Sequence, residues 1–295
     1  MPGEFLTVPE LAALLRIKER KVYDLAASGE VPVARVTGKL LFPAEEVRGW
    51  IARGSSGGGS VGGARRGAEP APRPAILLGS HDPLLDWAVR ASRCGLATLL
   101  DGSLDGLARF GRGEGMAAGL HLFDAEGGAW NVPAVRGTEG AVLAHWAVRR
   151  RGLVLRPEES GAVRALSDLA GRRVAPRQPE AGAQTLFEHL LAEAGVPADA
   201  LLYAPAAQSE GDAVLAVAEG EADAAFGLEA CARPYGLSFV PLVEERFDLL
   251  IDRRAYFEPP LQRLMAFCRS PGFRDHAAAR AGYDASACGE VVWNG

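Results

Sequence analysis

Residues 6–51 read LTVPELAALLRIKERKVYDLAASGEVPVARVTGKLLFPAEEVRGWI, and the order of elements in this stretch decides how the first part of the chain folds. Apolar side chains spaced three and four residues apart predict a helix over residues 10–15. Thr7 and Glu10 stand at the spacing of a capping box, which predicts that this helix begins beside them. A second amphipathic helix is expected over residues 19–28.

The rest of this stretch predicts a small wing. Two short strands are expected at residues 33–36 and 40–42, joined by a turn at residues 37–39, and a last amphipathic helix at residues 44–52. Residues 16–18 form the turn between the first two helices. Two helices at this spacing place the second one in the major groove of DNA.

Basic and aromatic side chains on this module are candidates for DNA contact. On and beside the second helix they are Lys18, Arg20, Lys21 and Tyr23, and on the wing they are Arg35 and Lys39. Phosphate oxygens accept most of the hydrogen bonds in protein–DNA interfaces, which suits these cations. The alternative is a protein-interaction module with a solvated basic face. The complete stretch resembles the winged helix-turn-helix of the MerR and excisionase type, and this resemblance implies binding to double-stranded DNA.

A composition break follows this module. Residues 54–74 read GSSGGGSVGGARRGAEPAPRP, with almost no apolar side chain, and such a stretch behaves as a flexible linker spanning about 25 Å. We therefore expect a DNA-binding domain at residues 1–53, a linker at 54–74 and a ligand-sensing domain at 75–295. We refer to the first and last of these as the head and the body.

The bulk properties exclude several classes of protein. The 295 residues carry a net charge of −5, so DNA binding has to come from a local patch. The four cysteines are scattered, which argues against a zinc site or a disulfide framework, and we expect no metal and no cofactor. No apolar run is long enough to span a membrane, and no secretory signal is recognisable, so a cytoplasmic location is expected.

The body alternates short apolar runs with helical patterns, which favours an α/β fold with parallel sheets. Strands are expected at residues 75–78, 97–100, 117–122, 172–175, 224–227 and 238–242, and helices at 83–93 and 182–194. In such sheets ligands bind at the carboxyl ends of strands, beside helix N-termini, whose free N–H groups suit an anion.

Three strand-to-helix turns supply the candidate ligand-binding residues. The first turn holds Ser80 and His81, the second Ser103, and the third Gly182 and Ala183. The two serines could donate to an anion or serve as plain helix caps.

Three further side chains are candidates at this site: His121, Arg177 and Glu229. His121 could reach the cleft or be a structural histidine. Arg177 could neutralise an anion or form a surface salt bridge. Glu229 could hold Arg177 or His121, or bind a donor of the ligand.

Several stretches of the body resemble the periplasmic-binding-protein-like domain of molybdate-binding proteins, and in particular a group of bacterial regulators in which that domain follows a DNA-binding head. They include GSHDPLLDW, DGSLDGL, DLAGRRVAPRQP and AEGEADAAFGLEA. The resemblance implies two lobes, whose crossovers we place near residues 152–157 and 243–249, and an oxyanion effector, molybdate or tungstate first. Related regulators often carry a Gly-Ser-Gly-Thr turn before the third helix, where this chain has Glu180-Ala181-Gly182-Ala183 without a hydroxyl.

Together these features predict a ligand-responsive transcriptional regulator that acts as a homodimer, because half-sites on DNA usually come paired. A regulator that senses phosphate or a small organic anion is the alternative, since Glu229 could accept the proton of such a ligand. A transport-type solute-binding protein is a further alternative. No Ser-His-Asp order, H-E-x-x-H or P-loop motif is present, so an enzyme is not expected.

Overall fold

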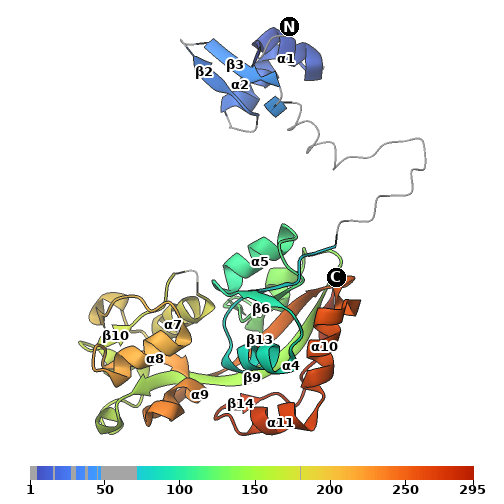
Figure 1. Ribbon diagram of the computed structural model, residues 1–295. Helices are drawn as coiled ribbons and strands as arrows, with labels where there is room; N and C mark the ends of the chain where they lie inside the picture. The colour runs from blue at the N-terminus through green and yellow to red at the C-terminus, as the bar shows by residue number, and fades with distance from the viewer. Residues whose placement is uncertain are drawn as a thin grey trace. The chain divides into compact units, whose positions relative to one another are not determined.

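The computed structural model describes residues 5–15, 17–27, 31–36, 39–44, 46–47, 72–179 and 181–295, and the chain divides into two compact units, residues 1–69 and 70–295 (Figure 1). Several predicted features lie outside the described residues: Arg16 in the first turn, the turn at 37–38, the end of the last head helix, most of the linker, and Glu180. The side chains of Arg35 and Lys39 also lie outside the description.

The head contains the predicted helix-turn-helix and wing. Its helices are α1 (Val8–Leu15) and α2 (Glu19–Ala27), and its strands are β1 (Phe5–Leu6), β2 (Ala34–Val36) and β3 (Lys39–Pro43). The strands form an antiparallel sheet in the order β1-β3-β2, of which the sequence did not predict β1. Thr7 donates its backbone N–H and its hydroxyl to Glu10 Oε2, both at 2.7 Å, so the predicted pair does mark the start of α1.

The body is built on one sheet with the strand order β11-β10-β12-β9-β13-β6-β4-β5. These strands are β4 (Ile76–Gly79), β5 (Ala97–Leu99), β6 (Ala117–Leu120), β9 (Ala141–Leu155), β10 (Arg173–Ala175), β11 (Leu202–Tyr203), β12 (Ala224–Leu228) and β13 (Ser238–Asp252). The pairs at the two ends of the sheet are parallel, as predicted, whereas β9 and β13 are antiparallel to their neighbours and to each other.

Strands β9 and β13 run through both lobes of the body (Figure 1). The end of β9, at Arg151–Leu155, pairs with β12 of the second lobe, and the end of β13, at Asp248–Ile251, pairs with β6 of the first lobe. The predicted crossovers therefore fall on or beside two strands that are far longer than the sequence suggested.

Helices cover the sheet of each lobe. In the first lobe they are α4 (Pro83–Ser92), α5 (Ser103–Gly111), α10 (Pro259–Cys268) and α11 (Pro271–Ala278), and in the second lobe α7 (Gly182–Glu193), α8 (Glu210–Ala218) and α9 (Glu229–Ala232). The shorter elements are β7 (Phe123–Asp124), β8 (Ala129–Trp130), α6 (Val132–Val135), β14 (Tyr283–Asp284), β15 (Val291–Asn294) and the 3-10 helices Pro157–Glu159, Leu166–Leu169, Ala198–Ala200, Arg233–Tyr235 and Ala255–Phe257. In the described part of the chain no helix is long and apolar enough to cross a membrane.

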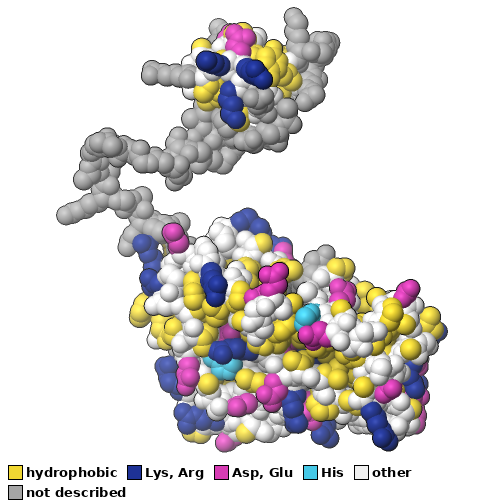
Figure 2. Space-filling view, turned by 180° about the vertical axis from the view of Figure 1, so that it is seen from behind, with side chains coloured by type: hydrophobic (Ala, Val, Ile, Leu, Met, Phe, Trp, Pro, Cys, Tyr) yellow, Lys and Arg dark blue, Asp and Glu magenta, His cyan; other side chains and the backbone are white. Residues whose placement is uncertain are grey.

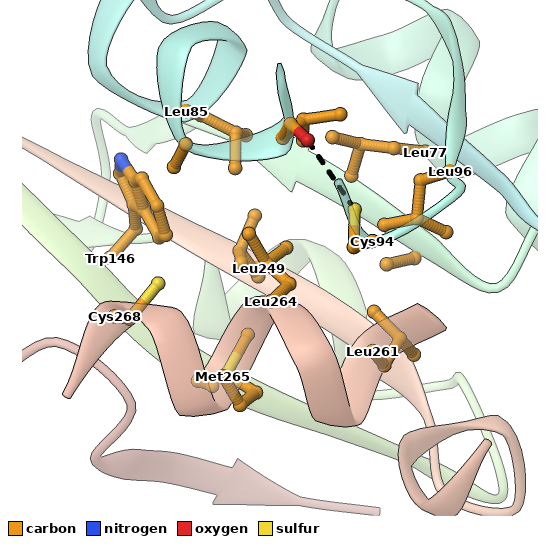
Figure 3. Packing of buried hydrophobic residues seen from close by; sticks show 14 of the residues in the cluster. Leu77, Leu85, Cys94, Leu96, Trp146, Leu249, Leu261, Leu264, Met265 and Cys268 are labelled. Carbon is orange, nitrogen blue, oxygen red and sulfur yellow. Dashed lines mark hydrogen bonds between the residues drawn. The ribbon is translucent and has the colours of Figure 1, made fainter. Parts of the chain in front are cut away.

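Each lobe has its own hydrophobic core. In the first lobe, Trp146 of β9 and Leu249 of β13 pack with α10 and α4 (Figure 3). In the second lobe, Leu153 and Leu155 of β9 pack with Phe226 of β12 and with α7. Each fully buried side chain of this size stabilises the fold by roughly 1.5–3 kcal/mol. Because the two cores are separate, the strands that cross between them are the natural place for a hinge.

Arg73, near the end of the predicted linker, binds residues of the first lobe and so holds the start of the body in place. Its Nε lies 2.8 Å from Asp252 Oδ2, and its guanidinium stacks 4.2 Å from the ring centre of Phe110. It also donates to the carbonyl oxygens of Phe110 and Gly115. The chain is therefore held to the body from about residue 73 onward.

Candidate functional site

A pocket of about 140 Å³ lies in the body where both lobes contribute residues, and we call it the polar pocket. Its lining residues are Ser80, His81, Leu100, Gly102, His121, Arg177, Gln178, Ala181, Ala183, Gln208, Ser209 and Glu210. Five of the residues proposed from sequence line it together: Ser80, His81, His121, Arg177 and Ala183. They come from strand ends and helix starts that are far apart in the chain, as expected if several strand-to-helix turns form one site.

Four helices begin at or next to the wall of the polar pocket. Asp82 caps α4, Gly102 and Ala181 precede α5 and α7, and Ser209 caps α8. The first N–H groups of a helix have no partner within the helix, and its N-terminus carries partial positive charge. The caps of α5 and α7 make no side-chain hydrogen bond to their helices. The pocket wall is therefore rich in backbone donors.

Gly79 allows the first of these turns to form. Its φ is 99°, a conformation that favours glycine, and a Cβ there would lie 2.2 Å from the carbonyl oxygen of Gly119. A Cβ on Gly106 of α5 would in turn lie 2.2 Å from Gly79 Cα. These close approaches bring the start of α5 against the end of β4, and thereby bring Ser80 next to Ser103.

Ser80 and Ser103 form a short chain of hydrogen bonds at the pocket wall. Ser80 Oγ lies 2.8 Å from Ser103 Oγ, and the backbone N–H of His121 donates to Ser103 Oγ at 3.1 Å. Ser103 is fully buried and is not part of the pocket lining. When Ser103 donates its proton to Ser80, the hydroxyl of Ser80 is free to donate into the pocket. Ser103 is thus placed to orient Ser80 from behind, one layer away from the direct contact that the sequence suggested.

A buried ion-pair network lies behind the polar pocket, with Glu245 of β13 at its centre. Glu245 Oε2 accepts from Arg151 Nε at 2.6 Å, and Oε1 pairs with Arg149 Nη2. Glu245 Oε2 also lies 3.0 Å from His121 Nδ1. Glu245, Arg149 and Arg151 have no exposed surface.

The network extends into both lobes from this centre. Toward the first lobe, Arg149 pairs with Asp82 at 2.9 Å, and Asp82 also accepts from Trp146 Nε1 and the Tyr283 hydroxyl. Toward the second lobe, Arg151 pairs with Glu210 at 2.8 Å.

Glu210 connects the network to the pocket itself. It pairs with Arg177 at 3.1 Å, and both residues line the polar pocket. Three arginines (Arg149, Arg151 and Arg177) are therefore matched by three carboxylates (Asp82, Glu210 and Glu245).

Two of these carboxylates, Glu245 and Glu210, are held in the charged form by the arginines beside them. Burial opposes ionisation of Glu245, but Arg149 and Arg151 together hold its pKa well below the usual value. Burial also opposes ionisation of Glu210, yet the charges of Arg151 and Arg177 lower its pKa to about 2. Because positive and negative charges balance, an anion in the pocket meets oriented donors without an excess cation.

His121 forms a hydrogen bond to the ion-pair network through its Nδ1 atom only, and its Nε2 atom makes none with the described residues of that network. Burial lowers its pKa, although the carboxylate of Glu245 partly offsets that effect, so the imidazole is neutral near pH 7. Because Glu245 is ionised, Nδ1 carries the ring proton and donates to it. Nε2 is then an acceptor, and it has no hydrogen-bond partner in the part of the chain that the structure describes. His121 can therefore accept a hydrogen bond from a ligand.

Besides Ser103, two sequence-predicted residues lie apart from the polar pocket lining. Gly182 lines a neighbouring cavity, and a Cβ on it would lie 3.0 Å from the carbonyl oxygen of His121. Glu229 pairs with Arg150 at 2.9 Å and with Arg233 at 2.8 Å, and it contacts neither Arg177 nor His121. The carboxylates that hold those two residues are Glu210 and Glu245.

Sequence reasoning missed Asp82, Arg149, Arg151, Glu210 and Glu245. One signal was present in the stretch AVLAHWAVRRRGLVL, where an apolar run surrounds three arginines. Arg149 and Arg151 are two apart and therefore share a face of β9, whereas Arg150 faces the other way and is half exposed. Arginines within an apolar strand indicate buried partners.

The head offers a separate candidate interface. Lys18, Arg20, Lys21 and Tyr23 are all exposed, at the start of α2 and along it, and Tyr23 is 53% exposed. The basic side chains of the described head residues gather on the face of the head seen in Figure 2. Arg35 and Lys39 lie on the paired strands β2 and β3.

Comparisons with known proteins agree with this architecture. The chain is 26% identical over 300 residues to the uncharacterized protein YvgK of Bacillus subtilis (strain 168), and the match covers 97% of both chains.

Two solved structures resemble the body with TM-scores of 0.51. A putative phosphate ABC transporter substrate-binding protein from Clostridium perfringens, with bound phosphate, is 13% identical, over 69% of this chain and 96% of that one. The regulatory domain of MetR, a LysR family regulator from N. meningitidis, is 12% identical, and the match covers 71% of this chain and 97% of that one. These likenesses show the fold.

Family models assign the two parts of the chain. The helix-turn-helix domain model matches residues 5–55, and the PBP superfamily domain model matches residues 87–269. The second match spans more than half of the chain, so the protein belongs to the PBP superfamily and carries a helix-turn-helix domain at its head.

Proposed function

We propose that this protein is a DNA-binding transcriptional regulator whose body senses a small oxyanion. The observation that carries the proposal is the polar pocket, where donors from both lobes converge in a chain that also has a helix-turn-helix head. A ligand that contacts both lobes favours their closed arrangement, and that preference is what can be transmitted to the head.

The proposed anion is molybdate or tungstate. Ser80 and the backbone N–H group of Ala183 would donate to it, and Ser103 would orient Ser80. Gly182, the other backbone donor predicted from the sequence, lines the neighbouring cavity. Both anions are fully deprotonated near neutral pH and need donors alone, which the helix N-termini supply. Arg177 lies at the pocket, but its charge is already matched by Glu210, so it would act as a directional donor.

A protonated phosphate or phosphonate is the second candidate, and two acceptors favour it. Glu210 lines the polar pocket as a carboxylate, and His121 Nε2 has no partner in the described chain. A similar fold from Prochlorococcus marinus, PhnD1, was solved with methylphosphonate (11% identity, TM-score 0.50, 71% of this chain and 91% of that one).

Assembly and location form part of the same proposal. We propose a homodimer formed through the body in the cytoplasm, because a single small head covers little DNA. Light scattering on the full chain at micromolar concentration would give twice the monomer mass. A monomer at that concentration would refute the dimer and leave the ligand proposal standing.

Calorimetry of the full chain with molybdate, tungstate, sulfate, phosphate and methylphosphonate tests the ligand. Ser80→Ala should weaken binding about ten- to a hundredfold, because a lost charge-assisted hydrogen bond costs about 1.5–3 kcal/mol. Ser160→Ala, at an exposed turn, is the matched control. The ligand should also change the affinity for DNA in a fluorescence anisotropy titration. No heat with any tetrahedral oxyanion would refute the oxyanion proposal.

A further inference from the structure

A second cavity of about 380 Å³ opens beside the polar pocket, and we call it the apolar cavity. Carbon-rich side chains make up most of its wall. Leu104 of α5, Phe123 and Pro133 come from the first lobe, and Thr185 and Leu186 of α7 come from the second. Nothing in the proposed binding of an inorganic oxyanion uses this volume.

The two cavities adjoin along the chain. His121 lines the polar pocket and Leu122 the apolar cavity, while Ala183 lines the first and Gly182 the second. The contact between Gly182 and His121 therefore lies on the boundary between them. The missing side chain at Gly182 keeps this boundary thin, since a Cβ would approach the His121 ring to 3.2 Å.

The wall of the apolar cavity is preformed. Phe123 contacts both Trp130 and His189, with ring centres 5.1 Å and 5.3 Å apart, which fixes its orientation. Leu104, by contrast, remains 48% exposed one residue beyond Ser103. An exposed leucine beside a fixed aromatic wall leaves apolar surface that a ligand could cover.

We infer that the apolar cavity is a second subsite, which holds an apolar substituent attached to the oxyanion in the polar pocket. The ligand class is then an organic anion with a tetrahedral oxyanion group and a short alkyl or aryl substituent, such as an organophosphonate. This inference rests on the proposed function, since the oxyanion group occupies the polar pocket described there. Both lobes line both subsites, so such a ligand favours closure of the lobes more strongly than an inorganic oxyanion does.

A homologous series tests the inference. Calorimetry of the full chain is run with inorganic phosphate and with methyl-, propyl- and phenylphosphonate at one pH. Affinity should rise about two- to fourfold for each added methylene group, because burying a methylene is worth up to about 0.8 kcal/mol. Phenylphosphonate should bind more tightly than methylphosphonate.

Variants in the apolar cavity test whether the added affinity of the larger phosphonates comes from this cavity. Leu104→Gln should remove most of the advantage of phenylphosphonate and leave the affinity for inorganic phosphate unchanged. Leu215→Gln is the matched control, since Leu215 is an exposed leucine of α8 that lines neither cavity. Thr185→Trp fills the apolar cavity from the other lobe and should have the same effect, with thermal melting confirming that each variant is folded.

The outcomes separate the two proposals. If affinity does not grow with the substituent, or if molybdate binds and no phosphonate does, the second subsite is refuted and the oxyanion sensor stands. If the gain persists in both Leu104→Gln and Thr185→Trp, the substituent lies elsewhere and the inference fails. If neither the inorganic oxyanions nor the phosphonates bind, both the oxyanion sensor and the second subsite are refuted.

Discussion

Replacing Glu245 by glutamine should be among the most destabilising single substitutions in the body. The glutamate is fully buried and holds two buried arginines and the ring of His121. Glutamine has nearly the same shape but no charge, so three arginines (Arg149, Arg151 and Arg177) would share the two carboxylates that remain, Asp82 and Glu210. One buried positive charge would then have no counter-charge.

Removing one partner from a buried ion pair costs about 3–5 kcal/mol. Because glutamine keeps one acceptor oxygen, we expect the lower end, about 3 kcal/mol of unfolding free energy. For a domain of this size that corresponds to a fall in Tm of about 6–12 °C. The pKa of Glu245 is depressed in the folded protein, so its contribution is fully present above its unfolded-state pKa of about 4.3 and is lost as the pH falls toward the folded-state value.

Guanidinium unfolding and calorimetric melting of the full chain at pH 7 measure the loss, and repeating both near pH 4 and below should show a smaller difference between the two proteins. Glu244→Gln is the matched control, because Glu244 is the exposed neighbour and its change should stay within about 0.5 kcal/mol. A loss below about 1 kcal/mol for Glu245→Gln, or a loss equal to that of Glu244→Gln, would show that the network does not stabilise the fold.

Three further predictions concern binding. Gly182→Ala should weaken oxyanion binding in calorimetry, because its Cβ would press on His121 and hold the lobes apart. Gly272→Ala on α11, where a Cβ meets open space, is the control and should leave the affinity unchanged. Equal affinities for the two variants would contradict this prediction. Arg20→Ala with Lys21→Ala should reduce the slope of log affinity for DNA against log salt by about 1.8 for each bound head, or about 3.6 for the proposed homodimer, in anisotropy titrations. An unchanged slope would exclude phosphate contacts from these residues. Oxyanion affinity should vary little with salt, since the charges around the polar pocket balance, and a steep dependence would indicate an unmatched cation there.

The sequence predicted the regular parts of the fold because their patterns are local. Helices α4 and α7 begin within a residue or two of their expected starts, and Thr7 with Glu10 marks the start of α1. The strand β9 was missed and β13 was predicted only over residues 238–242, because charged residues that read as surface interrupt both strands. Their burial follows from the cross-strand partners Arg149 and Glu245, which are 96 residues apart. A pattern read within one window can indicate that a buried partner exists, but it cannot identify a partner so far away in the sequence.

The candidate site divides in the same way. Ser80, His121 and Arg177 were found because each follows a strand, and the carboxyl ends of parallel strands meet at one edge. Glu229 was proposed to hold Arg177 or His121 because it also follows a strand. It begins α9 instead, and it pairs with Arg150 and Arg233.

The position of the ion-pair network constrains how the lobes can move. Its centre lies on the two crossing strands, at Arg149 and Arg151 of β9 and Glu245 of β13, while its ends reach Asp82 in the first lobe and Glu210 in the second. Separating any of these pairs would leave a buried charge without a partner, which is costly. Opening of the cleft therefore has to bend the strands around an intact network. The Gly182–His121 contact and the donors at the pocket wall are then the parts that separate, and a ligand that bridges them acts where the lobes are free to part.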